Sequence, residues 1–174
     1  MNFKEYYLIN ESKKDKPSYC LMAYLTEESI KKVAKISKSL NLKAREIVTP
    51  KQYHSTIRYF KTENDIKPFI EYLNKFKFKS STATGKDLDF LGDSYSLFVD
   101  SKDLSSVYNK INDWLIKNEY PKSDYPKYLP HLAFCYDPHK SWTPPEIDKT
   151  ECEIELTYDN YKLTKEHETI WKLK

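Results

Sequence analysis

Two histidines, His54 and His131, stand far apart in the chain in similar short segments, His-Ser-Thr-Ile and His-Leu-Ala-Phe. An imidazole titrates near pH ~6.5, so one ring can accept a proton while a second donates one at about the same pH. Cleavage of a phosphodiester needs both, because a base activates the attacking oxygen while an acid protonates the leaving oxygen. The pair therefore indicates acid–base catalysis, provided that the two segments lie side by side.

Each histidine segment alternates in the way expected of a strand with one buried face and one open face. Alternate side chains of a strand point to the same side, so His54 and Thr56 are predicted to share the open face. The same rule places His131, Ala133 and Cys135 together in the second segment. The hydroxyl of Thr56 could bond a non-bridging phosphate oxygen and stabilise its charge in the transition state.

Arginine is scarce in this lysine-rich chain, which contains Arg45 and Arg58 and no other. Strict alternation puts Arg58 on the same face as His54 and Thr56, where a guanidinium could contact a phosphate or a base. A salt bridge at the edge of a sheet is the alternative interpretation. The other two histidines, His139 in a proline-flanked loop and His167 in a polar turn, are expected to be solvated.

Metal binding is another use of clustered histidines and cysteines. His54, His131 and Cys135 could converge, but no carboxylate or further histidine stands at ligand spacing, so we expect no metal site. Cys20, Cys135 and Cys152 are odd in number and lack a Cys-x-x-Cys pair, which argues against a disulfide framework and a structural zinc site. Reduced thiols fit a cytoplasmic protein.

Composition excludes several classes of function. The 174 residues suit one domain, and a net charge of +3 from 29 basic and 26 acidic residues is too even for a protein that coats nucleic acid. The two glycines, Gly85 and Gly92, cannot form a glycine-rich phosphate loop, so kinase, GTPase and Rossmann folds are excluded and no cofactor is expected. No leader-like segment or membrane-length apolar run is visible.

The elements that must position the histidines occur twice in the same order. A strand, an amphipathic helix and a histidine strand are predicted in each half, with similar spacing from the helix cap to the histidine. We expect one domain over residues 1–174, with pseudo-repeats at about 18–92 and 93–174. The predicted fold is α+β and bilobal, with antiparallel sheets lining a central cleft and helices outside. The predicted strands are 18–25, 53–60, 77–92 with a turn at Gly85, 94–100, 130–136, 151–158 and 161–173.

These motifs resemble the two-histidine (2H) phosphoesterase superfamily, whose members carry His-x-Thr/Ser-x twice in a LigT-like fold. The segment 53–59 matches the motif fully, whereas 130–137 has Ala133 where the hydroxyl residue belongs. The resemblance implies metal-independent cleavage of a phosphodiester, with both histidines as acid and base in an order left open and with Thr56 on the phosphate. It also implies that Tyr19, Arg58 and Trp171 could grip the bases.

Within that superfamily, the compact size, the Tyr136-Asp137 pair and the lysine-rich, glycine-poor composition are similar to phage proteins of the anti-CBASS type. Those proteins degrade the cyclic di- and trinucleotides that signal infection in bacteria. The resemblance implies a nucleotide substrate and, if the protein is phage-encoded, the host cytoplasm as its place of action. We expect no membrane association, and no protein partner is evident. An RNA-end 2′,3′-cyclic phosphodiesterase is one alternative. A non-catalytic nucleotide-binding sponge is another, which Ala133 favours, unless a substitute donor such as Arg58 or a backbone amide replaces the missing hydroxyl.

Overall fold

The computed structural model describes residues 16–123 and 127–173. Its eight strands pair antiparallel in one continuous sheet. In chain order the strands are β1 (Ser18–Leu25), β2 (Ala44–Ile47), β3 (His54–Lys61), β4 (Ser81–Leu91), β5 (Ser94–Asp100), β6 (His131–Pro138), β7 (Glu155–Lys165) and β8 (Glu168–Lys172). Across the sheet the order is β2-β6-β5-β4-β7-β1-β3, and β8 pairs with β7.

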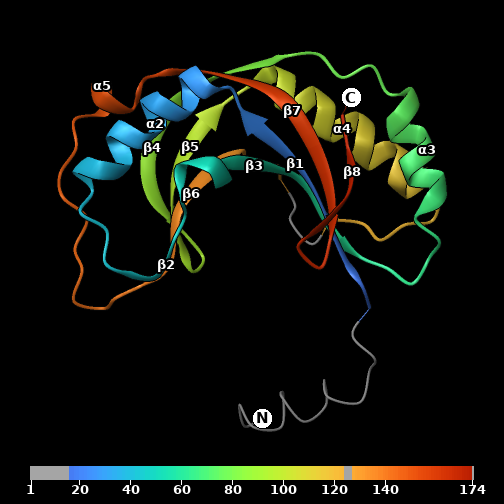
Figure 1. Cartoon of the computed structure of the whole chain (residues 1–174), viewed down its shortest axis with the longest axis horizontal. Coiled ribbons are helices and arrows are strands. Elements are labelled where there is room, and N and C mark those ends of the chain that lie inside the picture. Colours follow the sequence, from blue (N-terminus) through green and yellow to red (C-terminus); the bar gives the residue numbers. More distant parts are fainter. Residues whose placement is uncertain (1–15, 124–126, 174) are drawn as a thin grey trace, which may run out of the picture.

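Helices cover the outer side of this sheet, which curves into an arch (Figure 1). They are α2 (Glu27–Ser39), α3 (Lys67–Lys75) and α4 (Lys102–Lys117), with a short 3₁₀ turn η1 (Pro50–Gln52) and a short α5 (Lys149–Cys152). Thr26 caps α2 by accepting from Ser29 N at 3.3 Å, and Ser101 caps α4 by accepting from Leu104 N at 3.0 Å. No helix in the described part of the chain is long and apolar enough to cross a membrane.

The predicted α+β fold is therefore confirmed, with one difference. The two arms of the sheet, β2-β6-β5-β4 and β7-β1-β3, are joined to each other. Strand β7 pairs with β1 along one edge, and with β4 and then β8 along the other. The antiparallel strands predicted as separate sheets thus form one sheet, and each arm contains a strand from the other half of the chain. The boundaries of the two sequence repeats stay a prediction.

The predicted turn at Gly85 is wrong, because this glycine lies inside β4 at an irregularity in its pairing with β5. A Cβ at this position would lie 2.1 Å from the carbonyl oxygen of Cys152, so the close approach of two backbones requires glycine. The hairpin between β4 and β5 turns instead at Gly92, whose φ of +61° is in the left-handed region.

The two histidine strands occupy equivalent places in two matching units, β1-α2-β3 and β5-α4-β6. His54 begins β3 and pairs with Tyr24 of β1, while His131 begins β6 and pairs with Phe98 of β5. The apolar sides of both units pack under the helices, where Leu132 of β6 is fully buried. The histidine sides face the inner, concave surface of the arch. The repeated strand, helix and strand therefore bring the two motifs to a common surface.

Candidate active site

The same kind of backbone contact holds both histidine rings. Nδ1 of His54 lies 2.7 Å from the carbonyl oxygen of Gln52, and Nδ1 of His131 lies 2.8 Å from that of Leu129. A carbonyl oxygen can only accept, so each Nδ1 carries a proton and donates it. In the neutral ring this leaves the Nε2 lone pair free to take a proton from a substrate.

Burial lowers the pKa of both imidazoles below the usual 6.5, because the charged form loses hydration. Aromatic neighbours contribute to this environment, with ring centroids 5.4 Å apart for Tyr24 and His54 and 6.2 Å apart for Phe98 and His131. The carbonyl contacts act in the opposite direction and raise both pKa values. The positive charge of His131 lowers the pKa of His54 further, so the two rings lie close enough to interact.

One hydroxyl accompanies the first histidine as predicted. Thr56 is half-buried, and its Oγ1 lies 3.8 Å from Cys20 Sγ on the neighbouring strand. Burial raises the pKa of the Cys20 thiol to about 11, so this neighbour is a neutral thiol at physiological pH. Ala133 is also half-buried at the equivalent place in β6 and offers no oxygen.

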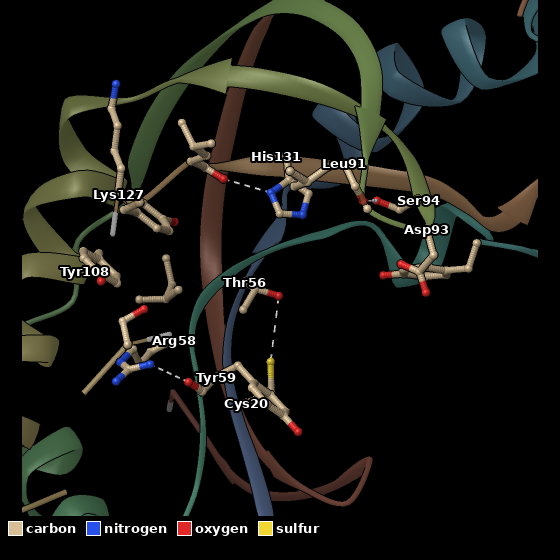
Figure 2. A pocket seen from close by; sticks show the side chains of 16 residues that line it. Cys20, Thr56, Arg58, Tyr59, Leu91, Asp93, Ser94, Tyr108, Lys127 and His131 are labelled. Carbon is tan, nitrogen blue, oxygen red and sulfur yellow. Dashed lines mark hydrogen bonds between the residues drawn. The ribbon is translucent and has the colours of Figure 1, made fainter. Parts of the chain in front are cut away.

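A cavity of about 400 Å³ opens beside these residues, within the roughly 300–1,000 Å³ common for small-molecule sites. The His131 ring and the Thr56 hydroxyl border the same open region in Figure 2. His54 is not among the residues that line the cavity, but it lies two positions before Thr56 on the same face of β3. Among the described residues, no three His, Cys, Asp or Glu side chains are placed to hold a metal ion.

One extra residue in each histidine strand decides which later side chains reach the cavity. The pairing of β1 with β3 skips Ile57, and the pairing of β5 with β6 skips Phe134. Such a bulge reverses the alternation beyond it. The predictions that Arg58 shares the face of His54 and that Cys135 shares the face of His131 are therefore wrong. Arg58 is 4% exposed and Cys135 is fully buried.

The bulges bring Tyr59 and Tyr136 to the cavity, and neither tyrosine was predicted from the sequence as a site residue. Tyr59 and Tyr136 each follow a bulge, occupy the same position relative to their histidines, and line the cavity. Tyr59 is 42% exposed. A tyrosine stands five residues after the histidine in both motifs, but strict alternation would place it on the face opposite the histidine.

The Arg58 guanidinium approaches the cavity from its buried side. Its Nη1 donates to the carbonyl oxygen of Tyr59 at 2.5 Å, and its Nη2 donates to that of Pro121 at 2.7 Å. Arg58 therefore ties the segment after α4 to β3, and Figure 2 shows it at the margin of the cavity. Its contact with a base remains a prediction.

The other two residues predicted to grip bases lie in the core. Tyr19 is 5% exposed and stacks on Phe60 with centroids 5.5 Å apart. Trp171 is 9% exposed, and its Nε1 donates to Asn74 Oδ1 at 2.9 Å. Neither lines the cavity. Tyr108, Lys127 and Tyr128 line it instead, from helix α4 and from the segment before β6, which carries no recognisable motif.

The same fold occurs in several solved structures, one of which is described as a phosphoesterase. The apo structure of Escherichia coli LigT matches with a TM-score of 0.62 and 12% identity, covering 92% of this chain and 98% of that one. LigT complexed with 3′-AMP matches with a TM-score of 0.63, 12% identity and coverages of 91% and 98%. The protein TT0787 of Thermus thermophilus matches with a TM-score of 0.66, 11% identity and coverages of 90% and 96%. No curated protein sequence matches the chain.

The fold and the site together define the class, a LigT-like sheet with an anchored histidine at the start of each of two equivalent strands. The finer assignment comes from the sequence. The family described as "Anti-CBASS protein Acb1" matches residues 17–171, and the chain belongs to this family.

Proposed function

We propose that this protein is a metal-independent phosphodiesterase that cleaves cyclic oligonucleotide signals. The observation that carries the proposal is the matched pair of imidazoles, each with Nδ1 bound to a backbone carbonyl and Nε2 left for the reaction. Membership of the Anti-CBASS protein Acb1 family supports a cyclic oligonucleotide as substrate. LigT, which shares the fold, has been crystallised with 3′-AMP, and this supports a nucleotide ligand.

The reaction uses a hydroxyl of the substrate itself as the nucleophile. Nε2 of one histidine removes the proton of the ribose 2′-hydroxyl, and the 2′-oxygen attacks the neighbouring phosphorus. The bond from phosphorus to the 5′-oxygen breaks, and Nε2–H of the other histidine protonates that oxygen. The ring opens to a linear product with a 2′,3′-cyclic phosphate, and Thr56 donates to a non-bridging oxygen during the step.

The electrostatics favour a pair with one neutral and one protonated ring. Two positive charges at this site repel each other, so each charged ring lowers the pKa of the other and the pair takes up its second proton at lower pH than its first. A neutral ring accepts the hydroxyl proton, and a protonated ring donates a proton to the leaving oxygen. Either histidine can take either role.

The test is incubation of the protein with cyclic di- and trinucleotides and with 2′,3′-cyclic nucleotides in EDTA, followed by chromatography. We expect ring opening of a cyclic oligonucleotide, and a loss of about 10²–10⁴-fold in rate for His54→Ala and for His131→Ala. His139→Ala is the matched control and keeps full activity.

Three other results would contradict the proposal. Tight binding without cleavage would show a sponge, and cleavage of 2′,3′-cyclic nucleotides alone would show an RNA-end phosphodiesterase. Activity that requires an added metal ion would show a different chemistry.

A further inference from the structure

Strand β5 carries two hydroxyls at the place where the second histidine motif lacks one. Ser96 pairs with Ala133, and Ser94 pairs with Tyr136. Directly opposite residues of an antiparallel pair point to the same face of the sheet. Ser94 and Ser96 therefore lie on the face of β5 that continues the cavity face of β6, and Ser94 lines the cavity (Figure 2).

The first unit shows how far a side chain at the Ser94 position reaches. Cys20 pairs with Tyr59 in β3 as Ser94 pairs with Tyr136 in β6. Cys20 Sγ comes within 3.8 Å of Thr56 Oγ1. From the matching register, we expect Ser94 Oγ to lie near the point that a hydroxyl at position 133 would occupy.

The hydrogen bonds of the two serines hold Ser94 in place. Ser94 Oγ donates to the carbonyl oxygen of Leu91 at 2.9 Å, and the Oγ atoms of Ser94 and Ser96 are 3.0 Å apart. A hydroxyl has one hydrogen, so the donor in the second bond is Ser96. A hydroxyl that accepts a hydrogen bond becomes a better donor. Ser94 can turn its hydrogen from Leu91 to a ligand while it still accepts from the fully buried Ser96.

We propose that Ser94, positioned by Ser96, donates the hydrogen bond to a non-bridging phosphate oxygen that the second motif cannot make through Ala133. The inference rests on the proposed phosphodiesterase function. It makes Ser94 a catalytic residue and Ser96 a positioning residue. The two units then hold opposite sides of one phosphate, with Thr56 on the first strand pair and Ser94 on the second.

Substitution tests the proposal in the full chain. Ser94→Ala should lower kcat by about 10–100-fold, as expected for a lost hydrogen bond to a charged oxygen. Ser96→Ala should lower kcat less, and the Ser94→Ala/Ser96→Ala double variant should be no slower than Ser94→Ala, because Ser96 acts through Ser94. Ala133→Ser should change the wild-type rate little and should restore much of the rate in the Ser94→Ala background.

A second measurement separates a phosphate contact from a structural role. The substrates are the Rp and Sp phosphorothioate forms of a cyclic dinucleotide that the wild-type protein cleaves. Sulfur is a weak acceptor, so Ser94→Ala should change the Rp to Sp rate ratio severalfold. Ser81→Ala, which removes a buried serine hydroxyl 2.7 Å from the Tyr161 hydroxyl, is the control and should leave the ratio unchanged.

The outcomes distinguish this inference from the proposed function. If the wild-type protein cleaves the unmodified dinucleotide and Ser94→Ala keeps its rate and its Rp to Sp ratio, the role of Ser94 is wrong and the phosphodiesterase stands. If Ser94→Ala is slow but keeps the wild-type ratio, the hydroxyl is structural. If the wild-type protein cleaves no nucleotide, the proposed function fails and the inference fails with it.

Discussion

Ser55 and His131 belong to different arms of the sheet, yet the Ser55 hydroxyl donates a hydrogen bond to the carbonyl oxygen of His131 at 2.9 Å. The Tyr158 hydroxyl lies 2.9 Å from the same Oγ and must be the donor there, because the single hydrogen of Ser55 is already used. Ser55 and Tyr158 are both fully buried. Since Ser55 adjoins His54 in the chain, this contact fixes the separation of the two imidazoles.

Ser55→Ala should therefore impair catalysis more than substrate binding. It leaves the His131 carbonyl and the Tyr158 hydroxyl without this partner, and we expect a loss of about 1–3 kcal/mol in the free energy of unfolding. A small change in the spacing of the rings should lower kcat by about 10-fold or more while KM changes little. Steady-state kinetics and urea unfolding measure both effects.

Ser81→Ala is the matched control for this prediction, because Ser81 also pairs with a buried tyrosine hydroxyl away from the histidines. It should cost similar stability and keep kcat. An equal fall in kcat for both variants would show that Ser55 acts through general stability alone.

The pH dependence should be bell-shaped, with its maximum on the acidic side of an ordinary histidine. The rate constant kcat/KM reports the free enzyme: it rises with pH as the base loses its proton and falls as the acid loses its own. Both imidazoles have pKa values below 6.5 through burial, so both limbs move to lower pH. We expect the maximum of kcat/KM below pH 6.5 in the presence of EDTA. A maximum in the alkaline range would contradict this environment for the two rings.

Removal of either tyrosine after the bulges should weaken substrate binding. An aromatic ring stacked on a base contributes about 1–3 kcal/mol, so Tyr59→Ala and Tyr136→Ala should each raise KM by about 10-fold with a smaller effect on kcat. Tyr59→Phe and Tyr136→Phe keep the ring and are the matched controls. Equal KM values for the alanine and phenylalanine variants would exclude stacking.

The two arginines offer a comparison between a buried and an exposed guanidinium. Arg58→Met removes donors to the carbonyl oxygens of Tyr59 and Pro121, and we expect a loss of about 3 kcal/mol in the free energy of unfolding. Arg45 forms a 3.3 Å ion pair with Asp137 and its side chain is 83% exposed, so Arg45→Met should cost less than about 1 kcal/mol. Urea unfolding measures both, and equal losses would contradict the structural role of Arg58.

The sequence predicted the elements that hold the histidines, because buried strands and capped amphipathic helices leave a periodic pattern. It also singled out His54 and His131, because the motif and its setting occur twice, and the roles of these histidines and of Thr56 in a reaction stay a prediction. A bulge leaves no such pattern, since one extra residue depends on the partner strand, and so Arg58 and Cys135 were assigned to the wrong faces. The edge strand β2 was not predicted, because its burial pattern is mostly exposed and its pairing with β6 is long-range.

The position of β7 in the middle of the sheet has a consequence for when the protein first becomes active. Tyr19 of β1 pairs with Lys165 of β7, so β1 can form this pairing only after a much later strand has been synthesised. Such distant pairings must overcome a large loop-closure entropy and fold slowly. During synthesis both histidines leave the ribosome before the strand that joins their arms. A chain still being translated therefore contains both histidine motifs, but their spacing is not yet fixed by β7. We expect activity only after β7 has left the ribosome and paired.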